Sequence, residues 1–250
     1  MVVLGATAVG LFVGRRLRHL SNNLKEPFAV LQGALLGVVG LLLAFGLALA
    51  VDRYETRRAA VVAEANAIGT AYLRAQTLRE PGRTDSLKLL VSYTDSTLLV
   101  SRSIPGSDRE KAANAAGEEL ERMLWRIAGR QLDAAPVASA QRLYVESLND
   151  MIDDESVRIA VLNNRVPYAV LFLEIAGAAL ALGLLAAYLA MLGRATLAVV
   201  LASVLVAMLL FVTCDLDRPT RGLIRVPDTP LVAVRDSMDE PPAAAAPRSP

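Results

Sequence analysis

Residues 28–51 read FAVLQGALLGVVGLLLAFGLALAV, an apolar run long enough to cross a membrane as a helix. At 1.5 Å per residue, about 20 residues cover the roughly 30 Å hydrocarbon core of a bilayer. Two further runs of this kind, 166–192 and 195–214, follow toward the carboxyl end. The sequence therefore predicts an integral membrane protein of the all-α class.

The amino-terminal residues 1–14 are also apolar but are too short to span comfortably on their own. The basic residues Arg15, Arg16 and Arg18 follow this stretch, whereas a signal peptide carries its charge before its apolar core. We therefore expect four transmembrane helices, or three if the first does not cross the membrane.

Between the first long run and the next lies a polar insert, residues 52–166. It holds 16 Lys and Arg against 17 Asp and Glu, a net charge of −1. Nucleic-acid binding needs a basic face, so a nucleic-acid partner is not expected. Apolar residues recur at helical spacing, and a helix over 55–79 is predicted to bury a face that carries Val61, Ala65, Ile68 and Tyr72. Its charged residues Arg57, Glu64 and Arg74 are expected mostly elsewhere around the helix.

Proline and glycine divide the insert into four helices. Pro81-Gly82 and Pro105-Gly106 end the first two, and Ser107 opens the third with Glu110 as its capping-box partner. Pro136 is expected in the first turn of the fourth. Four such helices favour an antiparallel bundle, whose outer helices could continue into the adjoining spans, with a break at Pro167.

The chain is thus predicted to fall into five parts. They are two transmembrane helices in 1–51, an extramembrane helical bundle in 52–166, two transmembrane helices in 167–214, a membrane-proximal tail in 215–238 and a disordered tail in 239–250. The positive-inside rule leaves the orientation open, because the basic loop before residue 28 is matched by arginines at the opposite ends of the spans.

Glu174 is the candidate functional residue within the membrane, since it lies inside an apolar run. A carboxylate there costs several kcal/mol unless it faces protein or water. The alternative is that it lies close enough to the interface to reach water. Gly33, Gly37 and Gly40 form a small-residue track that favours helix pairing in lipid, or else reflects the tolerance of membrane helices for glycine.

Opposite charges gather where the predicted spans leave the membrane. This candidate polar network comprises Asp52, Arg53, Asp215, Asp217, Arg218 and Arg221. It could line a vestibule, or it could anchor the tail against the start of the insert. In either case, the mixture of carboxylates and guanidinium groups predicts mutual pairing.

Few residues support catalysis or metal binding. His19 is the only histidine and Cys214 the only cysteine, which excludes multi-histidine metal sites and disulfides within one chain. Asp153, Asp154 and Glu155 are adjacent on a predicted helix, so they point in different directions and indicate a solvated face. We expect no cofactor and no enzymatic activity.

Several blocks resemble one family. They are DRYE at 52–55, EANAIGTAYLR at 64–74, LNNRVP at 162–167, and DLDRP at 215–219 followed by Arg221-Gly222. With the order of the spans, they resemble the bacterial "bestrophin-like domain" membrane proteins, a family of unknown function, over roughly residues 1–238.

The family's name implies a relation to bestrophins, which are pentameric anion channels with four membrane helices and a large helical region. The resemblance therefore implies a multi-pass protein of the bacterial plasma membrane that passes small anions as a homo-oligomer. No pore residue is carried over, because no run of residues matches a bestrophin pore. The alternative is a non-conducting scaffold or sensor whose helical bundle binds a partner protein.

Overall fold

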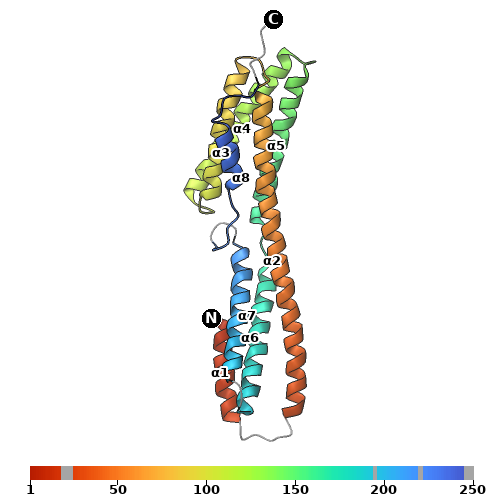
Figure 1. Ribbon diagram of the computed structural model, residues 1–250, viewed down its shortest axis with the longest axis vertical. Coiled ribbons are helices and arrows are strands. Elements are labelled where there is room, and N and C mark those ends of the chain that lie inside the picture. Colours follow the sequence, from red (N-terminus) through yellow and green to blue (C-terminus); the bar gives the residue numbers. More distant parts are fainter. Residues whose placement is uncertain (18–24, 194–195, 219–221, 245–250) are drawn as a thin grey trace. The chain divides into compact units, whose positions relative to one another are not determined.

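The computed structural model describes residues 1–17, 25–193, 196–218 and 222–244, apart from the side chains of 25–29 and 196. These residues form helices and no strands, which confirms the all-α prediction. In chain order the helices are α1 (Val2–Arg16), α2 (Lys25–Ala75), α3 (Gly82–Arg102), α4 (Asp108–Ala134), α5 (Ser139–Asn163), α6 (Tyr168–Met191), α7 (Thr196–Leu216) and α8 (Thr229–Ser237), as labelled in Figure 1.

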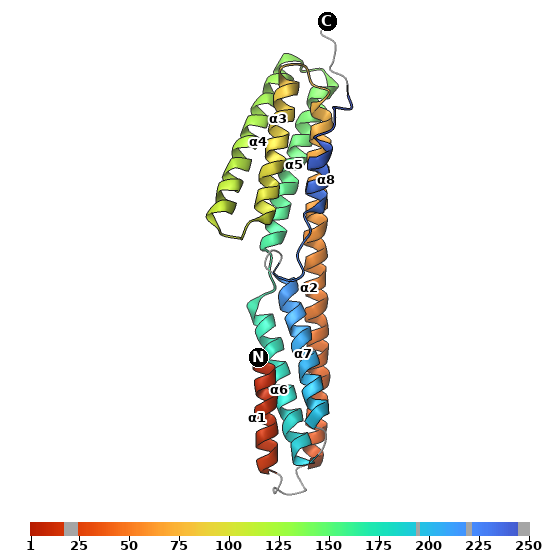
Figure 2. The ribbon, with the colours of Figure 1, turned by 60° about the vertical axis from the view of Figure 1, so that its left-hand side comes forward.

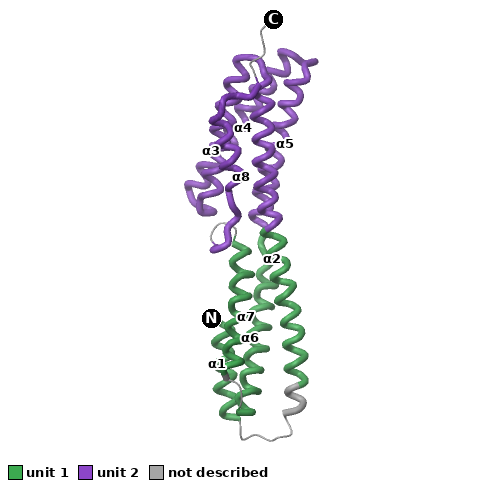
Figure 3. Tube along the Cα trace, in the orientation of Figure 1, with its two compact units in different colours: residues 1–54, 165–218 green, residues 55–164, 219–250 purple. Residues whose placement is uncertain are grey.

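The chain divides into two compact units, coloured separately in Figure 3. The membrane unit comprises residues 1–54 and 165–218, and the bundle unit comprises residues 55–164 and 219–250. Helix α2 contributes its first part to the membrane unit and the remainder to the bundle unit.

Three of the described helices are long and apolar enough to cross a membrane: the amino-terminal part of α2, then α6 and α7. Helix α1 has 15 residues, or roughly 22 Å, and so falls short of a full span. It packs against α6 and α7, beside which both Figure 1 and Figure 2 show it. The described residues thus hold three full-length spans and one shorter apolar helix.

Helix α1 approaches its neighbours through small residues. A Cβ atom added at Gly10 would lie 2.1 Å from the carbonyl oxygen of Gly183, and one at Gly14 would lie 2.1 Å from that of Ala187. The backbones of α1 and α6 are therefore in direct contact, as small residues permit in membrane helices. Thr7 Oγ1 and Ser203 Oγ, both buried and 2.8 Å apart, link α1 to α7 by a hydrogen bond.

The bundle unit encloses one apolar core. The predicted face of α2 is confirmed, since Val61, Ala65, Ile68 and Tyr72 are all buried. Large side chains from the other helices complete this core: Leu90, Tyr93, Leu124, Tyr144, Leu148, Met151 and Leu231.

The third helix of the insert, α4, begins as predicted. Ser107 is its N-cap and accepts a hydrogen bond from the backbone N–H of Glu110, whose carboxylate accepts from that of Gly106. The prediction for Pro136 is wrong. Helix α5 begins only at Ser139, because the chain first makes a turn in which the N–H of Ala138 donates to the carbonyl of Ala135.

The two junctions at the ends of the insert differ. Helix α2 runs without a break through residues 52–55, which confirms that the first helix of the insert continues a membrane helix. At the other end, α5 stops at Asn163 and α6 starts at Tyr168 with Pro167 as its N-cap. Pro167 has no N–H to donate, so a helix cannot pass through it without losing a hydrogen bond.

Candidate functional site

Glu174 lies in the membrane unit six residues after the start of α6, or about 9 Å along the helix. It is 3% exposed, so it does not reach solvent within this chain. Its carboxyl group occupies the space beside Gly46 of α2, where an added Cβ atom would lie 1.7 Å from Oε1. Gly46 therefore makes room for the carboxyl group, a role that the sequence did not reveal.

The carboxyl group of Glu174 is poorly satisfied. Its Oε2 atom is enclosed and has no hydrogen-bond partner among the described residues. An ionised carboxylate without partners in such surroundings costs several kcal/mol. The α2–α6 contact thus contains a polar group that gains from a proton, a water molecule or a movement of the helices.

Asp217 links the segment that follows the end of α7 to the segment that precedes the start of α6. It follows the last residue of α7, is 7% exposed, and its Oδ1 accepts a 2.8 Å hydrogen bond from the backbone N–H of Val166. Val166 directly precedes the N-cap of α6, whose first amides have no partner within the helix. A carboxylate is favoured near such a positive helix end.

The other members of the predicted polar network are placed less completely. Asp52 is exposed, Arg53 is half-buried and Asp215 is 8% exposed. Each of these three has a polar or electrostatic partner. The backbone N–H of Arg218 donates to the carbonyl of Asp215, and Arg221 lies outside the described residues. A single network joining all six residues stays a prediction.

The glycine track on α2 is open with respect to the described part of the chain. Among the described residues, an added Cβ atom at Gly33, Gly37 or Gly40 would meet nothing within 4 Å. The close approaches between helices instead involve Gly10 and Gly14 of α1, which meet the backbone of α6, and Gly46 of α2, which meets the carboxyl group of Glu174. The predicted role of the α2 track in helix pairing therefore stays a prediction, because no contact among the described residues fulfils it.

Arg57 in the bundle unit is fully buried, although the sequence suggested that it lies away from the apolar face. Its guanidinium group donates to the backbone carbonyls of Val161 (3.3 Å) and Asn164 (2.8 Å). These carbonyls belong to the last turn and C-cap of α5, where helix acceptors lack partners and a cation is favoured. Arg57 thus fastens the end of α5 to α2.

Glu64 and Arg158 form an ion pair inside the bundle unit, with side chains 0% and 1% exposed. Burial raises the pKa of Glu64 to about 7, although the Arg158 guanidinium opposes this. Glu64 is an exception to the expectation that the charged residues of this helix lie mostly off the apolar face. It is three residues after Val61 and four before Ile68, which are both buried, so helical spacing itself puts it on that face.

Glu121 of α4 is half-buried, and its Oε1 atom is enclosed without a hydrogen-bond partner among the described residues. Burial, together with the neighbouring Glu155 of α5, raises the pKa of Glu121 to about 8. The prediction of a solvated face holds for Asp153, which is exposed and accepts a hydrogen bond from Asn149, whereas Asp154 and Glu155 are half-buried.

A groove of about 600 Å³ runs along this side of α4 and α5. Trp125, 45% exposed, and Ile152 supply its apolar surface. The remaining lining is polar and comprises Glu119, Glu121, Arg122, Arg126 and Asn149.

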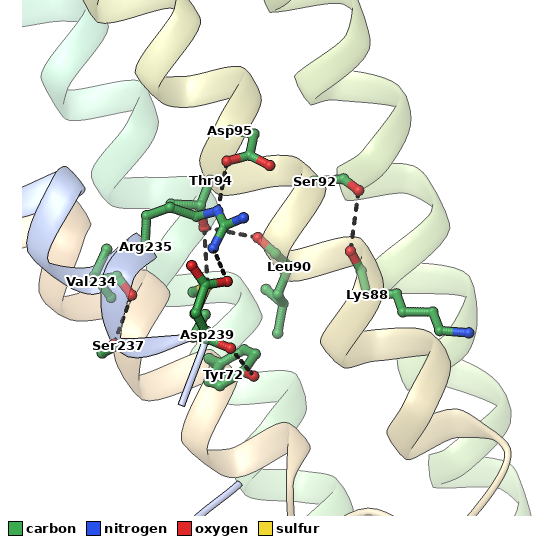
Figure 4. Close-up of polar contacts among 11 residues, drawn as sticks. Tyr72, Lys88, Leu90, Ser92, Thr94, Asp95, Val234, Arg235, Ser237 and Asp239 are labelled. Atoms are coloured by element: carbon green, nitrogen blue, oxygen red, sulfur yellow. Dashed lines mark hydrogen bonds and ion pairs between the residues drawn. The ribbon is translucent and has the colours of Figure 1, made fainter. Parts of the chain in front are cut away.

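The carboxyl-terminal helix α8 is fastened to the bundle by polar contacts, shown in Figure 4. Arg235 lies between two carboxylates, 2.6 Å from Oδ1 of Asp95 on α3 and 2.6 Å from Oδ1 of Asp239. The phenol of Tyr72 donates to the carbonyl of Met238 at 3.1 Å. Beyond the helix, the N–H of Ala244 donates to the side chain of Gln76, so the bonded chain extends past residue 239.

Apolar helices of spanning length, interrupted in the sequence by a helical insert, define a multi-pass membrane protein of the all-α class. The model of the bestrophin-like domain family matches residues 1–231. The chain therefore belongs to the bestrophin-like domain family, as the sequence blocks predicted. No curated protein is a significant match to it.

Solved structures share this fold. A crystal structure of a point variant of a bacterial bestrophin homologue from Klebsiella pneumoniae is similar with a TM-score of 0.70 at 12% identity, over 95% of this chain and 98% of that one. Another structure of the Klebsiella pneumoniae homologue gives 0.61 at 15% identity, over 94% and 95%. A variant membrane protein gives 0.68 at 15%, over 94% and 92%. The bestrophin fold thus extends over nearly the whole chain.

Proposed function

We propose that this chain forms a homo-oligomeric channel for small anions in a bacterial plasma membrane. The observation that carries the proposal is the family match over residues 1–231, together with the bestrophin fold over 95% of the chain. The three spanning helices agree with a membrane location. The proposed function requires neither a nucleic acid nor a cofactor.

We infer that the glycine track of α2 is a contact between subunits. Gly33, Gly37 and Gly40 are open within the chain, and large apolar side chains beside them, such as Val38 and Leu41, are 57% exposed. Small residues let a second membrane helix approach closely, and flanking apolar side chains then pack around it. Helix α2 therefore offers a neighbouring copy of the chain both the open glycines and the exposed apolar side chains beside them.

We assign Glu174 a role in controlling conduction rather than in contacting the anion. A carboxylate on the path would repel an anion, and this one is enclosed between α6 and Gly46 of α2. Its ionisation would favour entry of water into the contact, and would thereby favour a different spacing of the two helices.

Ion flux through the purified protein in liposomes tests this proposal. Chloride or iodide is expected to move in proportion to protein dose, while a large anion such as gluconate is retained. Glu174→Gln should change the flux, whereas Glu118→Gln, which removes a carboxylate that is 67% exposed on α4, should leave it unaltered. Unaltered flux in Glu174→Gln would keep the channel and refute the role of Glu174.

The second candidate is a non-conducting scaffold or sensor, and the groove along α4 and α5 favours it. An exposed tryptophan beside an apolar surface suits the docking of another protein. The liposome experiment separates the two candidates. Absence of flux from a folded oligomer, over a range of pH and calcium concentration, would rule out the channel and leave the scaffold.

A further inference from the structure

The sides of the four-helix bundle formed by α2, α3, α4 and α5 differ in the residues that they present. Helix α8 covers the side of α2 and α3, to which it is joined through Tyr72 and Asp95 (Figure 4). The groove that carries Trp125 lies between α4 and α5. Further grooves lie between α3 and α4 and between α2 and α5. Because these two grooves share no helix, they open on opposite sides of the bundle.

The groove between α3 and α4, of about 380 Å³, is cationic. Lys88, Arg126 and Arg130 line it with a single carboxylate, that of Asp85, so the lining has a net charge of +2. The three cationic side chains are exposed. Arg126 lies 3.3 Å from Glu119, whereas Lys88 and Arg130 form no ion pair with a described residue. The rest of the lining is apolar and comprises Leu89, Met123 and Ile127. This side of the bundle therefore offers positive charge beside apolar surface.

The groove between α2 and α5, of about 430 Å³, has the opposite charge. Its charged lining residues are Asp150, Asp153 and Asp154, which give it a net charge of −3. Asp150 and Asp153 are exposed, and Asp154 is half-buried. The other lining residues are small or uncharged and comprise Ala63, Asn66, Ala67, Thr70 and Ser147. Small side chains leave room for long ones, so this groove can admit lysine and arginine side chains from another molecule.

The two grooves lie at similar levels along the bundle. Helices α3 and α5 run in the same direction, as Figure 1 and Figure 2 show. Lys88 lies 14 residues before the end of α3, and Asp150 lies 13 residues before the end of α5, which is roughly 20 Å in each case. A second copy that stands beside the first in the same direction therefore brings unlike charges to the same level.

The charges also decide which grooves of two copies can face each other. Copies inserted in one membrane share a direction, so a rotation about the membrane normal relates them. Two α3–α4 grooves in contact would oppose cations to cations, and two α2–α5 grooves would oppose aspartates to aspartates, which is disfavoured. Only unlike grooves oppose a net charge of +2 to one of −3.

We propose that the bundle units of neighbouring copies pack side by side, with the α3–α4 groove of one copy against the α2–α5 groove of the next. The occupant of each groove is thus a second copy of this chain. Such a contact is heterologous, and its repetition about the membrane normal closes into a ring. The inference rests on the homo-oligomer of the proposed function and names a surface through which that oligomer assembles.

Cysteine cross-linking of the full-length protein in detergent tests the contact. Lys88→Cys combined with Asp150→Cys should form disulfides under mild oxidation, and the denatured product should run as a ladder of covalent oligomers. The two positions lie in grooves on opposite sides of one bundle, so a link between them joins two copies. Both are exposed, and the other charges of the grooves remain to attract the copies.

The matched control combines Lys111→Cys with Asp150→Cys. Lys111 is also an exposed cation of α4, but it lines neither groove, so this variant should form no ladder. The native Cys214 belongs to the membrane unit, and any link that it makes would appear equally in the two single variants. We therefore expect the ladder only in the variant that carries one cysteine in each groove.

Charge reversal provides the second measurement. Asp150→Lys should weaken the assembly at low salt by roughly 2- to 5-fold, since exposed ion pairs are modest and are screened by salt. Lys88→Asp added to the same chain should restore the assembly, because the two reversed charges then face each other across the contact. Analytical ultracentrifugation of the full-length protein in detergent measures both effects.

The outcomes separate this inference from the proposed function. An intact oligomer that gives flux in liposomes but forms no ladder would overturn the inference and leave the channel standing. Assembly that Asp150→Lys does not weaken, or that the second reversal does not restore, would also contradict it. A protein that stays monomeric at every concentration would overturn the inference and the homo-oligomer together.

Discussion

Replacement of Gly10 by alanine should weaken the attachment of α1 to α6. The new Cβ atom would lie 2.1 Å from the carbonyl oxygen of Gly183 and 3.0 Å from the Cβ atom of Ala186. Ordinary contact begins at 3.4 Å, so the backbone of α1 must retreat by more than 1 Å. No rotamer change relieves this clash, because the opposing atom belongs to the backbone.

The expected magnitude follows from two opposing effects. Overpacking of a close contact costs typically about 1–3 kcal/mol, whereas alanine is favoured over glycine within a helix by about 1 kcal/mol. Gly5→Ala on the same helix isolates the second effect, because an added Cβ atom there meets nothing within 4 Å. The difference between the two variants should therefore be about 1–3 kcal/mol, with Gly10→Ala the less stable.

Thermal unfolding of both variants in detergent measures this difference. For a chain of this size, 1 kcal/mol corresponds to roughly 2–4 °C in Tm, so a separation of several degrees is expected. Gly14→Ala should behave like Gly10→Ala, since it meets the carbonyl oxygen of Ala187 at the same 2.1 Å. Identical Tm values for Gly5→Ala and Gly10→Ala would refute the direct backbone contact of α1 with α6.

Three other substitutions test single contacts. Asp217→Ala removes the carboxylate that binds the N–H of Val166 and should cost about 1–3 kcal/mol of unfolding free energy, measured by thermal denaturation against Asp217→Asn. Thr7→Val removes the hydrogen bond to Ser203 and should cost about 0.6–1.7 kcal/mol in the same assay, and no change would show that the bond is replaced. Tyr72→Phe should cost about 1 kcal/mol and speed proteolytic removal of α8, and unaltered proteolysis would show that its phenol does not hold the tail.

The helical architecture could be predicted from the sequence because it depends on local patterns. A run such as 28–51 has few stable alternatives to a membrane helix, and Ser107 with Glu110 determines a helix start within four residues. The residues at which turns begin and end could be predicted less well from the sequence. Pro136 permits either a helix start or a turn, and the chain makes the turn, in which the N–H of Ala138 donates to the carbonyl of Ala135.

The polar interior could be predicted only in part. Spacing from Val61 and Ile68 puts Glu64 on the buried face, although a charged side chain is seldom fully buried unless it is paired. The partner Arg158 lies 94 residues further along the chain, and no local pattern links the two. Gly46 opposite Glu174 is likewise a contact between distant segments, which the pattern of a single sequence does not disclose.

The docking of α8 onto α3 imposes a parity on the membrane topology. Residues 55–164 and the tail that carries α8 belong to one folded unit, so both must lie on the same side of the bilayer. The chain must then cross an even number of times between Asn164 and Leu231, and α6 and α7 supply the two crossings. A reporter fused to the carboxyl terminus would therefore reveal the sidedness of the entire bundle.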